Sequence, residues 1–169
     1  MLLPDLLKNR ITDITADDLR ALGIRGLMLD VDNTLAIHGS QELDPAVEDW
    51  LRRMAEAGIG LTVVSNALPR RVAPFARRIG LEHVAFSCKP LPFGYLRGVK
   101  RLGLPRKACA IVGDQTFTDV IGGKLCGVRT IQLYPIQRER NAVARVKRWL
   151  EGHILKGYYR KHGDTPPNE

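Results

Sequence analysis

The chain has 169 residues, of which 44% are hydrophobic and 26% are charged, and its formal net charge at pH 7 is +8. These values favour one soluble domain with a real core, and no apolar run approaches the ~20 residues that cross a membrane. The three cysteines, Cys88, Cys109 and Cys126, are an odd number without a CxxC pair, which favours reduced thiols in a cytoplasm.

Residues 1–24 are predicted to form an N-terminal arm that leads into the core. The apolar start of the arm carries Asp5 and lacks the basic beginning and the long apolar middle of a signal peptide. Further along, Thr15 is expected to begin a helix that Gly23 ends. The first strand follows at residues 25–31, where an apolar run indicates a buried parallel strand.

Helices and strands alternate through the rest of the core, which is predicted to span residues 25–135. In chain order, we expect a helix at 44–58, a strand at 59–64, a helix at 68–79, a strand at 83–87, a helix at 93–102, a strand at 108–112, a helix at 116–125 and a strand at 128–133. Pro74 implies that the second of these helices starts late or is kinked. Such alternation predicts an α/β fold with a doubly wound, five-stranded, Rossmann-like parallel sheet.

A basic segment follows the core. Eight basic and two acidic residues between Arg138 and Lys161 give this segment a charge of +6 and leave +2 for the rest of the chain. We expect a basic C-terminal helix at residues 138–162, which either lies in a membrane interface or packs on the core with a solvated basic face. Basic clusters of this kind bind polyanions such as lipid surfaces or nucleic acid. Residues 163–169 are predicted to be a disordered tail.

Two aspartates, Asp30 and Asp32, end the first predicted strand. Alternation along an extended strand directs both carboxylates to the same side. Carboxylates held this close repel each other and lose hydration, so a cation is expected between them, and Mg²⁺ takes such oxygen ligands. A strand that ends in a hydrophilic turn explains the pair about as well, so the other motifs must decide between these two interpretations.

Three later strands also end in polar side chains, at Ser65, Lys89 and Asp114. Because the carboxyl ends of parallel strands meet at one edge of a sheet, these residues and the aspartate pair are expected at one site. Each residue alone is weak evidence, since such a serine often caps a helix and a lone lysine is usually solvated. Together they provide the carboxylates, hydroxyl and ammonium group that suit phosphoryl transfer.

The order of these motifs resembles that of the haloacid dehalogenase-like (HAD) phosphatases. Asp30-Val31-Asp32-Asn33-Thr34, Ser65-Asn66, Lys89-Pro90 and the segment at 113–119 match motifs I to IV of that family. The resemblance is closer to subfamily IIIA, in the YqeG and phosphatidylglycerophosphatase-like branch, where a Gly-Gly pair (here Gly122-Gly123), an N-terminal arm and a basic tail occur together. It implies one HAD-like phosphatase domain over residues 1–162.

The resemblance also implies catalytic and metal-binding roles. Asp30 would attack the phosphorus and form an aspartyl-phosphate, and Asp32 would protonate the leaving alkoxide and then activate water. Mg²⁺ would be the cofactor, held by the carboxylates of Asp30 and Asp114 and by the backbone carbonyl of Asp32. Positioning and charge stabilisation, which dominate phosphoryl-transfer catalysis, would come from these groups.

Further residues receive supporting roles from the same resemblance. Ser65 and the Asn66 amide would bind phosphate oxygens, and Lys89 would neutralise charge on the phosphate and the nucleophile. Asp119 would orient either the metal-bound waters or Lys89, and Thr34 would brace the turn after motif I.

The predicted site is open. Between Leu35 and Asp44, and again between Asn66 and Val84, the chain has room only for a turn or a helix, so we expect no cap domain. An open site suits a phosphate displayed on something large or on a surface. His38, in the turn after motif I, is a candidate for substrate contact.

Response-regulator receiver domains share the sheet, the Mg²⁺ site and an aspartyl-phosphate. In that family an acidic pair ends the first strand and the phosphoacceptor aspartate follows on a later strand. Here Ser65 ends the second strand of the core, and no aspartate follows until Asp114. The motif order therefore favours catalysis over phosphoacceptance.

The resulting hypothesis is a Mg²⁺-dependent phosphomonoester hydrolase that converts phosphatidylglycerophosphate to phosphatidylglycerol, the substrate being implied by the resemblance. A phosphorylated lipid head group and an anionic membrane are the expected partners, without nucleic acid, and the expected location is cytoplasmic and peripheral on the inner face of the membrane. The alternatives are a HAD phosphatase acting on a soluble or nucleic-acid phosphate, and a non-enzymatic binder of anionic lipid or nucleic acid through the basic tail. A pure binder has no need of both Asp30 and Asp32. The sequence predicts no oligomeric state.

Overall fold

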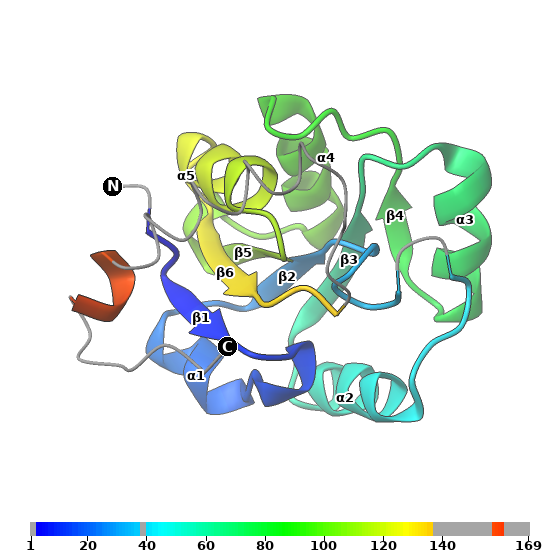
Figure 1. Cartoon of the computed structure of the whole chain (residues 1–169), viewed down its shortest axis with the longest axis horizontal. Helices are drawn as coiled ribbons and strands as arrows, with labels where there is room; N and C mark the ends of the chain where they lie inside the picture. Colours follow the sequence, from blue (N-terminus) through cyan, green and yellow to red (C-terminus); the bar gives the residue numbers. More distant parts are fainter. Residues whose placement is uncertain (1–2, 38–39, 137–156, 161–169) are drawn as a thin grey trace.

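The computed structural model describes residues 3–37, 40–136 and 157–160. Its centre is a parallel sheet whose strands, in spatial order, are β1-β6-β5-β2-β3-β4 (Figure 1). The strands are β1 (Leu6–Lys8), β2 (Gly26–Leu29), β3 (Gly60–Val64), β4 (Glu82–Val84), β5 (Cys109–Gly113) and β6 (Arg129–Leu133). The α-helices are α1 (Ala16–Ala21), α2 (Pro45–Glu56), α3 (Pro69–Arg78), α4 (Pro92–Leu102) and α5 (Gly122–Leu125). This architecture confirms the predicted α/β fold class.

The sheet has six strands in the described part of the chain, so the prediction of five was wrong by one. The additional strand, β1, comes from the N-terminal arm and pairs with β6. It is three residues long, which is too short to give a recognisable hydrophobic period. Asp5 fixes its start: the Asp5 backbone N–H donates to the carbonyl of Thr130 at 2.9 Å, and the Asp5 carboxylate accepts from the Thr130 N–H at 2.8 Å.

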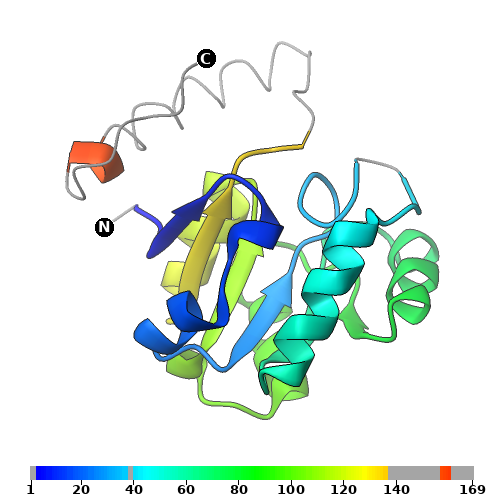
Figure 2. The same ribbon diagram turned by 90° about the horizontal axis from the view of Figure 1, so that it is seen from below.

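Helices cover both faces of the sheet. Leu27 and Leu29 of β2 belong to the core beneath α1, α2 and α3, whereas Met28 between them belongs to the core beneath α4. Figure 2 shows α1 and α2 lying together on one side of the strands. On α2, the buried indole of Trp50 donates to the carbonyl of Ile14 at 2.8 Å, which ties the arm to this layer.

The register of the central strands determines where the chain leaves the sheet. Leu29 of β2 is paired with Val112 of β5 and with Val63 of β3. All three strands are parallel and end within one residue of this level. The loops that follow β2, β3 and β5 therefore begin side by side at the carboxyl edge of the sheet.

The predicted helix at 116–125 is divided into two parts. Residues Thr116–Ile121 form a π-helical turn, and α5 continues from it. The glycine pair explains how α5 packs so closely: a Cβ atom on Gly122 would overlap the hydroxyl of Tyr95, and one on Gly123 would collide with Ile111. Short π-helical segments are frequent at functional sites.

Some predicted features fall outside the described residues. His38, the tail at 163–169 and most of the predicted C-terminal helix are among them, although residues 157–160 are helical and Tyr158 is buried. Within the described part of the chain, no helix is long and apolar enough to span a membrane.

Candidate active site

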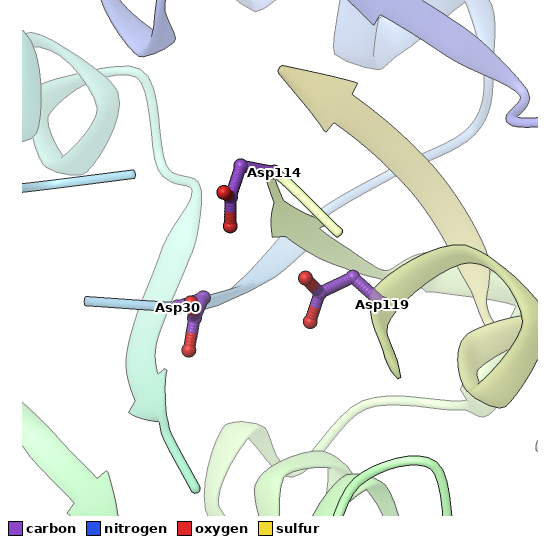
Figure 3. Close-up of side chains that lie close together, drawn as sticks. All are labelled: Asp30, Asp114 and Asp119. Atoms are coloured by element: carbon purple, nitrogen blue, oxygen red, sulfur yellow. The ribbon is translucent and has the colours of Figure 1, made fainter. Parts of the chain in front are cut away.

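Three buried carboxylates meet at the carboxyl edge of the sheet. Asp30 directly follows β2, Asp114 directly follows β5, and Asp119 belongs to the π-helical turn (Figure 3). Carboxylate oxygens of the three residues all lie within 4.8 Å of one another. The structure therefore brings together residues that are up to 89 positions apart in the sequence.

Lys89 supplies the positive charge between two of these carboxylates. Its Nζ atom lies 2.9 Å from Asp30 Oδ1 and 2.7 Å from Asp119 Oδ1, and only 2% of its side chain is exposed. Burial raises the pKa of the Asp30 carboxyl to about 6, against the opposing effect of the Lys89 ammonium. Asp30 is thus a buried carboxylate whose ionised form depends on its cationic neighbour.

The ammonium of Lys89 is itself held in the charged form. Burial lowers the pKa of Lys89, but the negative charges of Asp119 and Asp30 outweigh this effect and raise the pKa above its ordinary value. A charged lysine at this position can neutralise a phosphate as well as the carboxylates.

Asn66 holds the backbone of Lys89 in place. The Asn66 Oδ1 atom accepts from the Lys89 backbone N–H and from the Ser87 hydroxyl, both at 2.7 Å, and the Asn66 side-chain amide donates to the Lys89 carbonyl at 3.0 Å. The side chain of Asn66 is therefore engaged with the loop before α4. The Asn66 amide was predicted to bind phosphate, whereas this contact with the loop had no signal in the sequence.

Ser65 directly follows β3, in the loop that leads to α3. Its side chain is buried, and its Oγ atom accepts from the Ala67 backbone N–H at 3.2 Å. Because the hydroxyl is the acceptor in that bond, its own proton can be donated elsewhere. The Ser65 carbonyl accepts from the Ser87 N–H at 3.0 Å, which links the loops after β3 and β4.

The Asp32 carboxylate lies outside the cluster of three. Asp32 Oδ1 accepts from Nη2 of Arg71 at 3.0 Å, and both side chains are mostly buried. The Arg71 guanidinium also lies 6.0 Å from the centre of the Phe75 ring. Arg71 was not among the predicted site residues, because α3 contains four arginines and nothing in their spacing distinguishes this one.

Thr34 and Asn33 lie in the turn after motif I, and both are buried. Asn33 adopts a left-handed backbone with φ of 61°, and its N–H donates to the Ala36 carbonyl at 2.8 Å. The Thr34 N–H donates to the Val31 carbonyl at 3.3 Å, whereas its hydroxyl has no hydrogen-bond partner among the described residues. Backbone contacts rather than the threonine hydroxyl thus hold this turn.

Gly113 leaves room for Asp119. A Cβ atom on Gly113 would overlap the carboxylate of Asp119. The same oxygen that this atom would overlap, Oδ2, accepts from the Gln115 backbone N–H at 3.1 Å. The glycine before Asp114 is therefore required by the close approach of Asp119 to the end of β5.

The donor set of this cluster fits a divalent metal ion. Its carboxylates are hard oxygen ligands of the kind that Mg²⁺ binds. Three carboxylates beside one ammonium carry a formal charge of −2, which a divalent cation would balance. Both carboxylates that were predicted as ligands, those of Asp30 and Asp114, lie in this cluster. The third predicted ligand was the backbone carbonyl of Asp32, not its carboxylate.

The proteins that this chain resembles are hydrolases and phosphatases. A sequence model of the haloacid dehalogenase-like hydrolases matches residues 4–127. The probable phosphatase YqeG of Bacillus subtilis (strain 168) is 33% identical over 159 residues, which cover 94% of this chain and 92% of that protein. The chloroplastic phosphatidylglycerophosphate phosphatase 1 of Chlamydomonas reinhardtii is 27% identical over 143 residues, covering 79% of this chain and 53% of that protein. The chain thus spans about half the length of this algal relative.

A solved structure supports the fold. The crystal structure of an uncharacterized protein from Listeria monocytogenes serotype 4b aligns with a TM-score of 0.57 at 16% identity, over 70% of this chain and 85% of that one. The family model matches most of the chain, and the similarity to YqeG extends over nearly the whole length of both proteins. The chain therefore belongs to the haloacid dehalogenase-like hydrolases and is a phosphatase that acts on phosphoric monoesters.

Proposed function

We propose that this phosphatase uses Mg²⁺ and an aspartyl-phosphate on Asp30 to hydrolyse phosphatidylglycerophosphate to phosphatidylglycerol. The observation that carries the chemistry is the buried contact of Lys89 with both Asp30 and Asp119, at 2.9 and 2.7 Å, beside Asp114. This arrangement provides a nucleophilic carboxylate and a fixed positive charge in one buried site. Such preorganised charge is a large contribution to phosphoryl-transfer catalysis.

In the first step, a carboxylate oxygen of Asp30 forms a bond to phosphorus as the bond from phosphorus to the substrate alkoxide breaks. Lys89 holds the nucleophile and balances the charge of the phosphate. The Ser65 hydroxyl, whose proton is available, donates to a phosphate oxygen, as does the Asn66 backbone N–H.

Asp32 carries the proton in both steps. It donates a proton to the leaving alkoxide, and it then takes one from the water that attacks the aspartyl-phosphate. Its contact with Arg71 supports this assignment, because the guanidinium fixes the direction of the carboxylate. General acid–base help of this kind is worth roughly 10²–10⁴-fold in rate.

Asp30, Asp114 and the backbone carbonyl of Asp32 would hold Mg²⁺, which when bound supplies charge that balances the phosphate oxygens. Asp119 holds Lys89 in place at 2.7 Å. Thr34 completes the buried turn that carries Asp32.

The substrate is proposed from two observations. One relative, from Chlamydomonas reinhardtii, is a phosphatidylglycerophosphate phosphatase by name. The segments that follow β2 and β3 are short: α2 begins at Pro45, and α3 is the one helix between β3 and β4. A site without a cap domain can accept a phosphate that is displayed on a membrane. We further propose that the enzyme acts from the cytoplasmic side, as a peripheral protein on the inner face of the membrane.

A substrate screen tests the proposal. Phosphate release is measured from phosphatidylglycerophosphate in vesicles and from a sugar phosphate, a nucleotide monophosphate and a 5′-phosphorylated oligonucleotide. We expect the lipid to be the preferred substrate and the Asp30→Asn variant to be inactive on all of them. A preference for a soluble or nucleic-acid phosphate would overturn the lipid substrate, and an active Asp30→Asn variant would overturn the mechanism.

A further inference from the structure

Four large apolar side chains are exposed close to the candidate active site. Leu68 is 46% exposed, Phe86 59%, Leu91 53% and Phe93 62%. They come from the loop before α3, the loop after β4 and the first turn of α4. We call these four residues the apolar rim. Clusters of exposed apolar residues mark interaction sites more often than single ones do.

Backbone contacts place the members of the apolar rim near one another. The Phe86 N–H donates to the carbonyl of Ala67, the residue before Leu68, at 2.9 Å. The Leu91 N–H donates to the carbonyl of Cys88 at 2.8 Å, and Gly94, which follows Phe93, packs against Ser87. The rim is thus one surface made by two adjoining loops.

The same loops carry catalytic candidates. The Ser65 carbonyl accepts from the Ser87 N–H at 3.0 Å, and Asn66 holds the Lys89 backbone. Each phosphate-binding candidate therefore lies within a few residues of the apolar rim. A partner that contacts the rim therefore lies close to these candidate residues.

Phe86 is exposed in spite of a strained backbone. Its φ of 47° is in the left-handed region, which bulky side chains rarely adopt. The strain is not explained by core packing, because most of the phenyl ring is in solvent. The backbone is fixed on both sides: its carbonyl accepts from Arg97 at 3.4 Å, and its N–H is bound to the loop after β3. The fold thus presents this ring outward.

The charge around the rim indicates the chemistry of its partner. The two helices that begin at the rim contain no acidic residues. Their basic residues nearest the rim are Arg70 in the first turn of α3 and Arg97 in α4, which donates to the carbonyls of Phe86 and Phe93. Arg70 and Arg97 are exposed next to the apolar side chains. Apolar side chains among cations are typical of surfaces that lie in the interface of an anionic membrane.

We propose that the apolar rim docks on a bilayer that contains anionic phospholipid, with Phe86 and Phe93 inserted among the head groups and the active site facing the membrane. The proposal deepens the proposed function, on which it rests for its lipid substrate. Docking in this orientation would bring a head-group phosphate to Lys89 without lifting the lipid out of the bilayer. The partner is a surface rather than a soluble molecule.

Vesicle binding tests the proposal without turnover. The full-length Asp30→Asn variant is sedimented with vesicles of phosphatidylcholine alone and of phosphatidylcholine mixed with phosphatidylglycerol. Phe86→Asn and Phe93→Asn are then added singly and together. Leu125→Asn is the matched control, because Leu125 is 80% exposed but is the last residue of α5, just before β6 begins, at the amino ends of the strands.

We expect binding to the mixed vesicles, weaker binding to phosphatidylcholine alone, and about a tenfold loss of partitioning for each phenylalanine replaced. Leu125→Asn should leave binding unchanged. Phe86→Asn should also melt at the same or a higher temperature than its parent, because asparagine tolerates a left-handed backbone. Reduced binding by a variant that is no less stable separates docking from a structural effect.

Other outcomes overturn the proposal. Unchanged vesicle binding by the double phenylalanine variant would show that the rim does not contact lipid. A dimer in solution that dissociates in the same variant would assign the rim to a second copy of the chain. If vesicle binding depends on the rim but the active enzyme releases no phosphate from phosphatidylglycerophosphate, docking would be supported and the proposed substrate would be wrong. Normal turnover of phosphatidylglycerophosphate in vesicles by an enzyme that keeps Asp30 and carries both Phe86→Asn and Phe93→Asn would overturn docking and leave the proposed substrate in place.

Discussion

The Nζ atom of Lys89 lies 2.7 Å from Oδ1 of Asp119, and neither side chain is more than 2% exposed. The Gln115 backbone N–H donates to the carboxylate of Asp119 and holds it in place. Gly113 has no side chain, which leaves room for that carboxylate. The position of the ammonium beside Asp30 is thus set by a carboxylate that comes from a different loop. Substitutions in this group should affect both stability and chemistry.

Replacing Lys89 by Met should destabilise the enzyme and inactivate it. Removal of the ammonium leaves Asp30 and Asp119 buried beside each other, which typically costs about 3–5 kcal/mol in the free energy of unfolding. Adding Asp119→Asn to Lys89→Met should recover part of that loss, because one buried charge is removed. Neither variant should regain phosphatase activity.

Urea unfolding of the two single variants and the double variant measures this coupling. Lys100→Met is the control, since Lys100 is an exposed lysine on α4. Equal stability of Lys89→Met and Lys100→Met would contradict the assigned contact.

The sequence was sufficient to predict that the residues after the central strands meet at one edge of the sheet. Apolar runs that end in Asp30, Ser65 and Asp114 identify buried parallel strands, and parallel strands in register must release their loops at one edge. Chain direction and hydrophobic period therefore determine the position of these residues. No long-range information beyond the alternation of strands and helices was required.

Other features had no local signal. β1 is too short to show a period, and its pairing depends on Asp5 contacting Thr130, 125 positions away. The π-helical turn at Thr116–Ile121 follows from close packing that involves residues distant in the sequence. The contact between Arg71 and Asp32 depends on how α3 lies relative to β2. Each of these features is decided by tertiary contacts.

Removal of metal should abolish phosphate release, and Mg²⁺ should restore it. Asp114→Asn should require a much higher Mg²⁺ concentration for half-maximal activity, because a charged oxygen ligand is lost while Asp30 remains buried. Asp49→Asn, at an exposed carboxylate on α2, is the control. Metal is removed from each variant with a chelator, and phosphate release is then measured as Mg²⁺ is added back. Full activity after exhaustive chelation would exclude a metal requirement.

Arg71→Gln should slow the enzyme by about tenfold or more if it orients the acid that protonates the leaving group. The loss should be large with glycerol 3-phosphate, whose alkoxide needs a proton, and small with p-nitrophenyl phosphate, whose phenolate does not. Arg70→Gln is the matched control, because Arg70 is the exposed neighbour on the same helix. Both substrates are soluble, so membrane docking does not enter the comparison.

A structural role for Arg71 predicts a different result. Equal losses of kcat on the two esters would show that the guanidinium supports α3 rather than Asp32. Partial recovery of the glycerol 3-phosphate activity by Arg71→Lys, at unchanged melting temperature, would support the orienting role.

Asp5 should make the stability of the sheet depend on pH. Burial alone would raise the pKa of Asp5, but hydrogen bonds from the Thr130 backbone and from Lys124 outweigh it and hold the pKa below the ordinary 3.8. A lowered folded-state pKa means that the ionised form stabilises the fold. That contribution is complete above pH 3.8 and is lost as the pH falls through the lower, folded-state value.

Asp5→Asn should therefore lower the free energy of unfolding by about 1–2 kcal/mol at neutral pH, since a carboxylate that accepts several hydrogen bonds is lost. As the pH falls below 3.8 and through the lower folded-state pKa, the difference from the wild type should shrink, because the wild-type carboxyl then becomes protonated in both states. Asp17→Asn, at an exposed aspartate on α1, should show neither effect. Urea unfolding across this pH range measures all three proteins. A difference that stays constant as the pH falls would show that Asp5 holds β1 against β6 by its shape and not by its charge.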